Sequence, residues 1–269
     1  MMLAVLINGR GPEAASIAAD DRGLNYGDGL FETLCLRSGA IRFLDAHLDR
    51  LARGCTQLSI EMPSHEVLRA DLETITRGIR DGVVKIVVTR GAGGRGYRPG
   101  RTTPTRIVSL HPAPTIPAAA KIRVRWCETR FARNAKLAGL KHLNRLEQVL
   151  AQAEWDDQAI AEGLMLDTEG ELVSVTAGNV FLVRDGVLVT PDLRFCGVRG
   201  VMRAQVLKAA AQLGVATQEE PLWPHDIDAA SELFVTSAVR GIRPIVALES
   251  LEWSASPVAA RIAAQIEQA

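Results

Sequence analysis

The sequence predicts an α+β (mixed α/β) protein of two domains, and three observations support this prediction. Alternating apolar and polar runs typical of strands occur together with helically spaced apolar residues in both halves of the chain. A stretch with three prolines and no periodicity, HPAPTIPAAA, separates the halves at residues 111–120. A length of 269 residues suffices for two domains with cores of their own. We therefore expect an N-terminal α/β domain over residues 1–113, a linker over 114–120 and a C-terminal domain over 121–269.

The N-terminal half combines short strands, separated by glycine-rich turns, with two helices. Strands rich in Val, Ile and Leu are expected at Leu3–Asn8, Phe31–Arg37, Val83–Arg90 and Arg106–Leu110. Helical spacing of leucines predicts a helix from about Leu44 to Leu58, and a second from about Ser64 to Ile79, with Ser64 near its start.

The C-terminal half begins with an expected strand at Lys121–Cys127, followed by an irregular basic stretch. Apolar residues from Leu143 to Ala153 recur at helical spacing, which predicts a helix of about 18 residues with Lys141 at or just before its start. Further strands are expected at Gly163–Asp167, Glu171–Val175, Asn179–Val183, Val187–Thr190, Leu233–Thr236 and Ile242–Leu248, with a helix at about Gly200–Leu213.

Composition argues against several classes of function. The chain has 31 basic and 31 acidic side chains without blocks of one sign, so it has no electrostatic footprint for nucleic acid or an acidic membrane. The four cysteines are far apart and the five histidines lack ligand spacing, so we expect neither disulfides nor a metal site. No run approaches membrane-spanning length, and the apolar N-terminus lacks a basic segment before it. We expect a cytoplasmic protein.

Lys141 differs from the other four lysines in its surroundings. It follows Gly139-Leu140 and precedes Leu143, and a position at a helix start combined with desolvation would lower the pKa of its amine. A neutral amine near pH 7 can act as a nucleophile. The remaining lysines, Lys85, Lys121, Lys136 and Lys208, are interpreted as solvated charges.

Five segments occur in an order that covers nearly the whole chain. They are Asp21–Thr33 (DRGLNYGDGLFET), His47–Leu51 (HLDRL), Arg90–Tyr97 (RGAGGRGY), Lys141–Glu147 (KHLNRLE) and Asn179–Phe181 (NVF). Together they resemble the fold type IV pyridoxal phosphate-dependent enzymes, the family that includes branched-chain and D-amino-acid aminotransferases. Within this family they are most similar to the aminodeoxychorismate lyases. The resemblance implies a two-domain fold, pyridoxal 5'-phosphate on Lys141, and a homodimer.

The resemblance also implies roles for individual residues. Lys141 would carry the cofactor and act as general base, and Thr33 would orient substrate or cofactor. The cofactor-binding residues it implies are Arg50 for the phosphate, Val201 and Met202 at a helix start, Asn144, Ser174 and Ser237. The substrate-binding residues it implies are Arg95 and Tyr97 in the glycine-rich loop, which we interpret as a carboxylate-binding loop rather than a nucleotide or RNA loop, and Arg240.

Ser174 departs from the family's pattern. In the family, a glutamate five residues before the asparagine of the Asn-x-Phe segment pairs with the pyridine nitrogen, and here Ser174 occupies that position. Glu171 is three places away on an expected strand, so it points to the opposite face. A serine hydroxyl cannot hold a proton on the nitrogen, so the ring becomes a weaker electron sink. This favours an elimination over a transamination.

The resemblance therefore implies a lyase that converts 4-amino-4-deoxychorismate to 4-aminobenzoate and pyruvate in folate biosynthesis. Two alternatives remain open from the sequence. One is a D-amino-acid or branched-chain aminotransferase of the same fold, and the other is a catalytically silent pyridoxal phosphate-binding protein.

Overall fold

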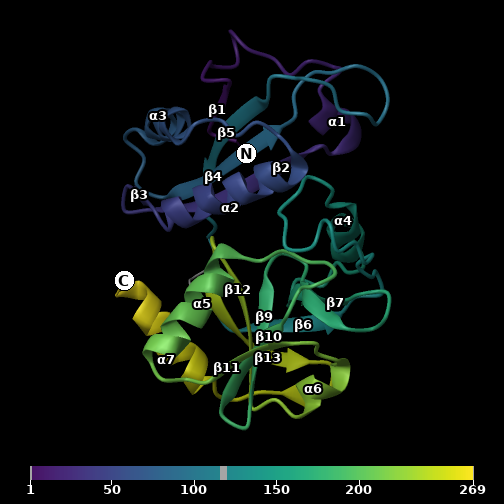
Figure 1. Ribbon diagram of the computed structural model, residues 1–269. Coiled ribbons are helices and arrows are strands. Elements are labelled where there is room, and N and C mark those ends of the chain that lie inside the picture. Colours follow the sequence, from purple (N-terminus) through teal and green to yellow (C-terminus); the bar gives the residue numbers. More distant parts are fainter. Residues whose placement is uncertain (1, 116–119, 269) are drawn as a thin grey trace. The chain divides into compact units, whose positions relative to one another are not determined.

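The computed structural model describes residues 2–115 and 120–268, which fall into two units (Figure 1). Unit 1 holds the described residues up to Thr115 together with Lys141–Asn144, and unit 2 holds the rest. The expected linker at 114–120 falls largely on residues 116–119, which lie outside the described residues.

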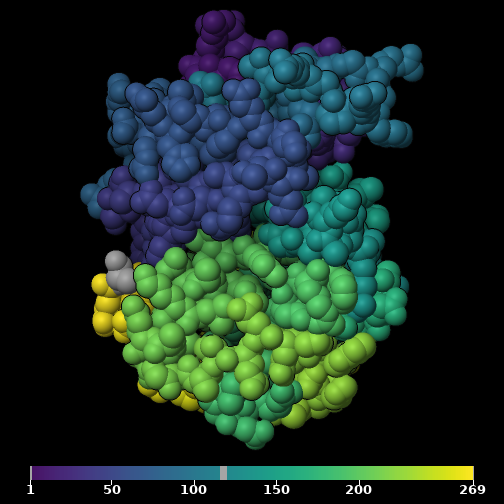
Figure 2. Space-filling model, in the orientation of Figure 1, coloured from purple at the N-terminus to yellow at the C-terminus, as the bar shows by residue number. Residues whose placement is uncertain are grey.

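Unit 1 is built on a five-stranded antiparallel sheet in the order β1-β5-β4-β2-β3. Its elements are β1 (Ala4–Ile7), α1 (Arg22–Tyr26), β2 (Gly29–Arg37), β3 (Ala40–Ile41), α2 (Leu44–Leu58), α3 (His65–Thr76), β4 (Gly82–Thr89) and β5 (Thr105–Pro112). Helix α3 ends earlier than the sequence predicts, and its cap residue Ser64 accepts a hydrogen bond from the Val67 N–H, as its position indicates. Helix α2 lies along the sheet, and in the space-filling view its atoms cover the strands behind it (Figures 1 and 2).

The two faces of this sheet have different characters. Residues whose side chains point toward α2, such as Leu34, Val84 and Ile86, are fully buried. The alternate residues Phe31 and Thr33 are only half-buried and point to the other face. In the register of β2 and β4, Thr33 is paired with Lys85, so Lys85 lies on this second face as well.

The segment around Lys141 extends the edge of the unit 1 sheet. The Phe31 N–H donates to the Lys141 carbonyl at 2.9 Å, and the Leu143 N–H donates to the Gly29 carbonyl at 3.0 Å. A β-carbon at Gly29 would lie 2.8 Å from the Leu143 side chain, so the absence of a side chain permits this approach. The sequence assigns Lys141 to the C-terminal domain, whereas these backbone hydrogen bonds attach it to unit 1.

The predicted helix of about 18 residues after Lys141 is wrong. Helix α4 spans only Leu146–Gln152, and Lys141 precedes it by five residues in extended backbone. Three of its apolar side chains are exposed, with relative accessibilities of 69% for Leu146, 60% for Val149 and 54% for Leu150. Their helical spacing therefore reflects an apolar surface rather than a core face. The proposed effect of a helix N-terminus on the Lys141 amine does not apply, because the helix starts too far along the chain.

Unit 2 contains a mixed sheet in the order β11-β10-β9-β12-β13-β6-β7-β8, with β14 paired to β13. The strands are β6 (Ile122–Trp126), β7 (Ile160–Leu166), β8 (Leu172–Val175), β9 (Asn179–Arg184), β10 (Val187–Pro191), β11 (Thr217–Glu220), β12 (Glu232–Ser237), β13 (Gly241–Leu248) and β14 (Leu251–Glu252). The sheet curls, because β8 at its end also contacts β9 and β10. Its concave side encloses a core that includes Leu164, Leu182, Leu233 and Ile245.

Three further helices complete unit 2: α5 (Val201–Gln212), α6 (Pro224–Asp228) and α7 (Pro257–Glu267). Helices α5 and α7 pack against each other and against β12 (Figure 1). The sequence predicts α5 within one residue at each end but does not predict α7. Within the described residues, Cys35, Cys55, Cys127 and Cys196 are free thiols. In the same part of the chain, no helix has both the length and the apolarity to cross a membrane.

Candidate active site

Lys141 lies on the half-buried face of the unit 1 sheet, next to Phe31. Because the Lys141 backbone pairs with the edge of β2, its side chain reaches over the ring, and the ammonium nitrogen is 4.2 Å from the ring centre. Thr33 follows Phe31 on the same face of the strand. Asn144 donates a side-chain hydrogen bond to the Gly27 carbonyl at 3.3 Å, which fixes the turn that precedes β2. Unit 1 thus places Lys141, Thr33 and Asn144 near one end of β2.

Arg50 is held by a buried acid. Its Nε donates to Oε1 of Glu32 at 2.8 Å, and a second N–H donates to Oε2 of the same carboxylate. The ring of His47, also buried, contacts Glu32 at 2.6 Å. Glu32 alternates with Phe31 and Thr33 along β2, so this cluster lies on the α2 face of the sheet. The structure therefore gives Arg50 a fixed internal partner, and its contact with a cofactor phosphate stays a prediction.

Glu32 is ionised in this cluster. Burial alone would raise the pKa of its carboxyl group, but hydrogen bonds from His47 and Arg50 outweigh burial and hold the pKa below its usual value. A charged carboxylate in turn fixes the fork of the Arg50 guanidinium in one orientation.

The glycine-rich loop after β4 is attached to helix α1. Arg22 donates to the carbonyls of Gly96 and Tyr97 at 2.8 and 3.1 Å, and to Asp28 at 3.0 Å. Arg90 also donates to Asp28, at 2.7 and 3.0 Å. Partial burial tends to raise the pKa of Asp28, but hydrogen bonds from the two arginines lower it overall. Arg90 and Arg22 therefore hold the loop in place and are not available to a substrate.

The two residues that the sequence proposes for this loop lie on its exposed part. Arg95 is exposed, and the Tyr97 side chain is 87% accessible, with an edge contact to Tyr26 at 5.7 Å between ring centres. The structure neither buries them nor gives them an internal polar side-chain partner among the described residues. Their role toward substrate carboxylates remains a prediction.

In unit 2, helix α5 starts without a side-chain cap, and its first backbone N–H groups are here called the α5 cradle. Its N-cap residue Gly200 provides no side-chain cap, and a β-carbon there would lie 2.2 Å from Oδ1 of Asn179. Asn179 donates to the Val198 carbonyl at 2.8 Å and so fixes the chain that enters the helix. Thr236 is paired with Asn179 across β12 and β9, and its hydroxyl is buried with no hydrogen-bond partner in the described part of the chain. Uncapped helix N–H groups suit an anion such as a phosphate, and a buried hydroxyl without a partner is a further candidate donor.

Val201 and Met202 are the first two residues of α5, so the structure places both predicted residues at this helix start. Ser237 follows Thr236 at the end of β12, and its hydroxyl accepts the Arg240 N–H at 3.2 Å. The hairpin between β12 and β13 is thereby stabilised next to the α5 cradle.

Arg240 shares a buried acid with Arg243. Glu162 on β7 accepts hydrogen bonds from Arg243 at 2.7 Å and Arg240 at 3.2 Å through Oε1, and from Thr176 at 2.6 Å through Oε2. Two guanidinium groups on one carboxylate leave a net positive charge, and the Arg240 side chain remains 35% accessible. A role for Arg240 toward a substrate carboxylate stays a prediction.

Ser174 is buried in β8 and donates its hydroxyl proton to the Val175 carbonyl at 3.0 Å. Glu171 forms ion pairs with Arg133 and Arg194 at 3.0 and 2.9 Å. This engagement agrees with the expectation that Glu171 does not replace the family's glutamate. The orientation of Ser174 toward a cofactor ring remains a prediction.

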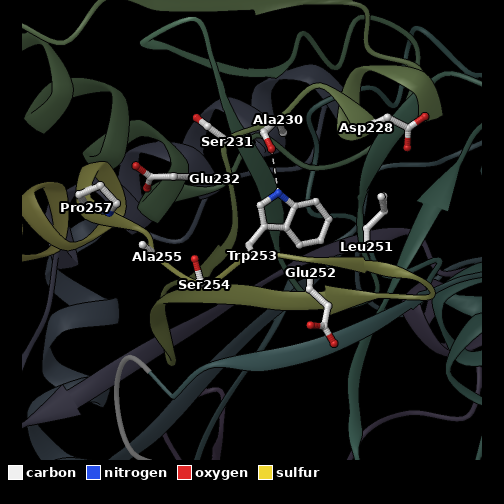
Figure 3. Close-up of a pocket in the computed structure, with 10 residues that line it drawn as sticks. All are labelled: Asp228, Ala230, Ser231, Glu232, Leu251, Glu252, Trp253, Ser254, Ala255 and Pro257. Atoms are coloured by element: carbon white, nitrogen blue, oxygen red, sulfur yellow. Dashed lines mark hydrogen bonds between the residues drawn. The ribbon is translucent and has the colours of Figure 1, made fainter.

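A separate cavity of about 480 Å³ lies in unit 2 at the start of β12 (Figure 3). Its ionisable lining residues are the acids Asp228, Glu232 and Glu252, and Trp253 closes it by donating to the Ala230 carbonyl at 2.8 Å. Glu232 already accepts the N–H groups of Val258 and Ala259 at the start of α7. An acidic lining repels phosphates and carboxylates, and Thr236 and Ser237 lie at the opposite end of β12. We therefore do not place the active site here.

Pyridoxal phosphate fits the residues that remain. Lys141 offers an amine beside an aromatic ring, and α5 with Thr236 offers donors for a phosphate. The sequence does not single out Thr236 or Glu162. A signal existed for Glu162, because an acid within the apolar run of β7 must be paired when buried.

Comparison with known proteins identifies the family. The model of the amino-transferase class IV family matches residues 29–248, and the chain belongs to this family. The crystal structure of 4-amino-4-deoxychorismate lyase from Pseudomonas aeruginosa is 44% identical, with a TM-score of 0.92 and 98% of each chain covered. Aminodeoxychorismate lyase of Vibrio harveyi is 33% identical over 86% of this chain and 87% of its own length. A candidate branched-chain-amino-acid aminotransferase of Methanocaldococcus jannaschii is also 33% identical, over 87% of this chain and 83% of its own.

Proposed function

We propose that this chain is a pyridoxal phosphate-dependent lyase that converts 4-amino-4-deoxychorismate to 4-aminobenzoate and pyruvate, in the synthesis of folate. The observation that carries the proposal is the 44% identity to the Pseudomonas aeruginosa lyase over 98% of both chains. The placement of Lys141 beside Phe31 and Thr33, together with the α5 cradle, supports it.

Lys141 would hold the cofactor covalently through its amine, and that amine, once the substrate amine has displaced it from the cofactor, would act as the base of the reaction. Pyridoxal phosphate, when bound, supplies an electron-withdrawing ring that acidifies the C–H bond beside the substrate amine. The Lys141 amine removes that proton, the bond from the neighbouring carbon to the enolpyruvyl oxygen breaks, and the ring becomes aromatic. The proton passes to the departing enolpyruvate, which leaves as pyruvate.

Other residues hold the reactants in place. Val201 and Met202 would supply backbone N–H groups of α5 to the cofactor phosphate, Thr236 and Ser237 would supply hydroxyl groups, and Arg50, fixed by Glu32, would supply a guanidinium. Thr33 and Asn144 orient the groups near Lys141. Ser174 would lie toward the pyridine nitrogen, and Arg95, Tyr97 and Arg240 would contact the substrate.

The protein acts as a cytoplasmic homodimer in this proposal. The exposed apolar side chains of α4 support a dimer, because three such side chains on a seven-residue helix form an apolar patch that a second copy can cover.

A transaminase of the same fold is the second candidate, since the Methanocaldococcus jannaschii relative is 33% identical. The test measures the products from purified holoenzyme and 4-amino-4-deoxychorismate. We expect equal amounts of 4-aminobenzoate and pyruvate, and no turnover by Lys141→Ala. The matched variant Lys208→Ala, which removes an exposed amine, should retain activity. Transfer of the amino group to a keto acid without release of pyruvate would refute the lyase in favour of the transaminase.

Borohydride trapping identifies the amine that binds the cofactor. We expect the reduced adduct on Lys141 alone. Lys85 is the competing amine, because its ammonium group lies against the same phenylalanine ring. An adduct on Lys85 would mean that Lys85, not Lys141, binds the cofactor. If no lysine carried an adduct, the protein would not bind the cofactor covalently.

A further inference from the structure

Two loops of unit 2 are joined by backbone hydrogen bonds and lead to the two parts of the proposed cofactor site. The first loop, residues 134–140, is followed directly by Lys141, and the second, residues 195–200, is followed directly by α5. Where the loops begin, the Asn134 N–H donates to the Phe195 carbonyl at 2.8 Å. We call these two segments the paired loops.

The paired loops are joined most closely at Gly139. Its N–H donates to the Gly197 carbonyl at 3.0 Å, and its carbonyl accepts the Arg199 N–H at 3.1 Å, which is the pattern of a parallel bridge. The φ angle of Gly139 is +81°, and a β-carbon there would lie 3.1 Å from the Arg199 side chain. A side chain at this position would therefore strain the bridge. Gly139 precedes Lys141 by only two residues, so a shift of the bridge is passed along the chain to the backbone of Lys141.

Asn179 attaches the second loop to the central sheet of unit 2. It is the first residue of β9 and is buried, and its side-chain amide donates to the Val198 carbonyl at 2.8 Å. Val198 lies between the two residues that form hydrogen bonds with Gly139. Oδ1 of Asn179 lies against Gly200, where a β-carbon would be only 2.2 Å away. One buried side chain thus contacts the second loop both at the bridge and at the start of α5.

The beginning of the second loop is fixed by charged side chains. The guanidinium groups of Arg133 and Arg194 both lie over the Phe195 ring, at 4.6 and 4.7 Å from its centre. Both arginines also form ion pairs with Glu171, at 3.0 and 2.9 Å. Because this end is fixed, movement of the paired loops is confined to the end that carries the bridge and the start of α5.

We propose that Asn179 is a positioning residue that couples the phosphate donors of α5 to Lys141 through the paired loops. This inference rests on the proposed function, in which one cofactor is bound by both. A phosphate at α5 orders residues 198–200, the bridge extends that order to Gly139, and the amine two residues later is held in position for the cofactor. Asn179 itself forms and breaks no covalent bond.

Pyridoxal and inorganic phosphate test this coupling, because together they represent the two halves of the cofactor. The aldehyde of pyridoxal condenses reversibly with the Lys141 amine and releases water, and borohydride reduction identifies the modified lysine. Full-length protein freed of cofactor is titrated with pyridoxal, without phosphate and with saturating phosphate, and visible absorbance gives both dissociation constants. Their ratio measures the coupling. For wild type we expect phosphate to strengthen pyridoxal binding at least about fivefold, the lower end of the usual range for coupled sites.

Asn179→Ala removes the amide that binds the Val198 carbonyl. We expect the ratio to fall toward one, even when the phosphate concentration is raised to saturate the variant. A residue that only shapes the phosphate site would act differently, because its loss would weaken phosphate binding but leave the ratio at saturation unchanged.

Gly139→Ala strains the bridge without changing Asn179 or the donors of α5. We expect it to lower the ratio while the dissociation constant of inorganic phosphate stays near the wild-type value. Gly186→Ala is the matched control. Gly186 has a φ of +77° in the turn between β9 and β10, and an added β-carbon there would meet no atom of the described residues within 4 Å. The control carries a similar backbone strain but should keep the wild-type ratio.

The inference is overturned if phosphate does not strengthen the binding of pyridoxal to wild type, or if pyridoxal does not modify Lys141. It is also overturned if Gly139→Ala keeps the wild-type ratio, or if Gly186→Ala loses as much of it. The Gly139 variant decides the outcome even where Asn179→Ala does not fold. Coupling in a wild-type protein that releases no 4-aminobenzoate would refute the lyase and retain the inference, whereas lyase turnover without coupling would do the reverse.

Discussion

Replacement of Glu32 by Gln should destabilise unit 1 strongly. The Glu32 side chain is 1% accessible and that of Arg50 is 11% accessible, so the pair is shielded from water. Gln keeps the shape of Glu but leaves the Arg50 charge without its counter-ion and presents an amide N–H₂ group to donors. Breaking a buried pair in this way costs about 3–5 kcal/mol. This is a large part of a typical unfolding free energy of about 5–15 kcal/mol.

The matched control is Asp45→Asn on α2, the helix that carries Arg50. Asp45 forms an ion pair with Arg69, but both side chains are exposed, so we expect a loss below about 1 kcal/mol. Urea unfolding at fixed cofactor content gives both free energies, and hydrogen exchange at the amides of β2 and α2 assigns the loss to unit 1. A loss in Glu32→Gln no larger than in Asp45→Asn would refute the reasoning.

The same pair predicts a pH dependence. Hydrogen bonds from His47 and Arg50 lower the pKa of Glu32 in the folded protein despite its burial. The resulting stabilisation is complete above the unfolded pKa of about 4.3 and disappears as the pH falls through the folded pKa. The difference in unfolding free energy between wild type and Glu32→Gln should therefore shrink below about pH 4.3. A difference that stays constant from neutral pH to pH 3 would contradict the ionised Glu32.

Two further predictions concern unit 2. Thr236→Val removes a buried hydroxyl that has no partner among the described residues. We expect it to weaken cofactor affinity about tenfold without destabilising the cofactor-free protein. Equal cofactor dissociation constants for wild type and variant would exclude this hydroxyl from the phosphate site. Ser174→Glu should hold a proton on the pyridine nitrogen and so raise the rate of amino-acid transamination relative to lyase turnover. Both rates are measured after cofactor content and folding are verified. An unchanged ratio of the two rates together with an unchanged visible spectrum would mean that position 174 does not face the ring.

Local patterns predict much of the fold. Runs rich in Val, Ile, Leu and Phe locate β2, β4 and β9, and leucine spacing locates α2 over the same residues as the structure. Helix α7 escapes prediction because alanines occupy much of it, so only Ile262 and Ile266 mark its buried side with large side chains. The extended backbone at Lys141 is set by hydrogen bonds to β2, more than 100 residues away in sequence, and no local signal indicates them.

The sequence predicts those candidate site residues that lie in a recognisable motif. It does not predict those that are brought to the site only by the pairing register of two strands. Lys141, Thr33 and the start of α5 lie within quoted segments or helix signals, and the structure places them in surroundings that suit a cofactor. Lys85 carries no such signal. Its position beside Lys141 follows from the pairing of β2 with β4, and periodicity alone does not fix which residues of two strands are paired.

The pairing of charges explains why arginines mislead as markers of the substrate site. Arg90 and Arg22 share Asp28, and Arg240 and Arg243 share Glu162, so these guanidinium groups are engaged with acids of the protein itself. Fork-shaped donors suit such internal bidentate contacts, which fix loops and hairpins. A guanidinium that already binds an acid of the protein must break that contact before it can bind a substrate carboxylate, and breaking a buried pair is strongly unfavourable.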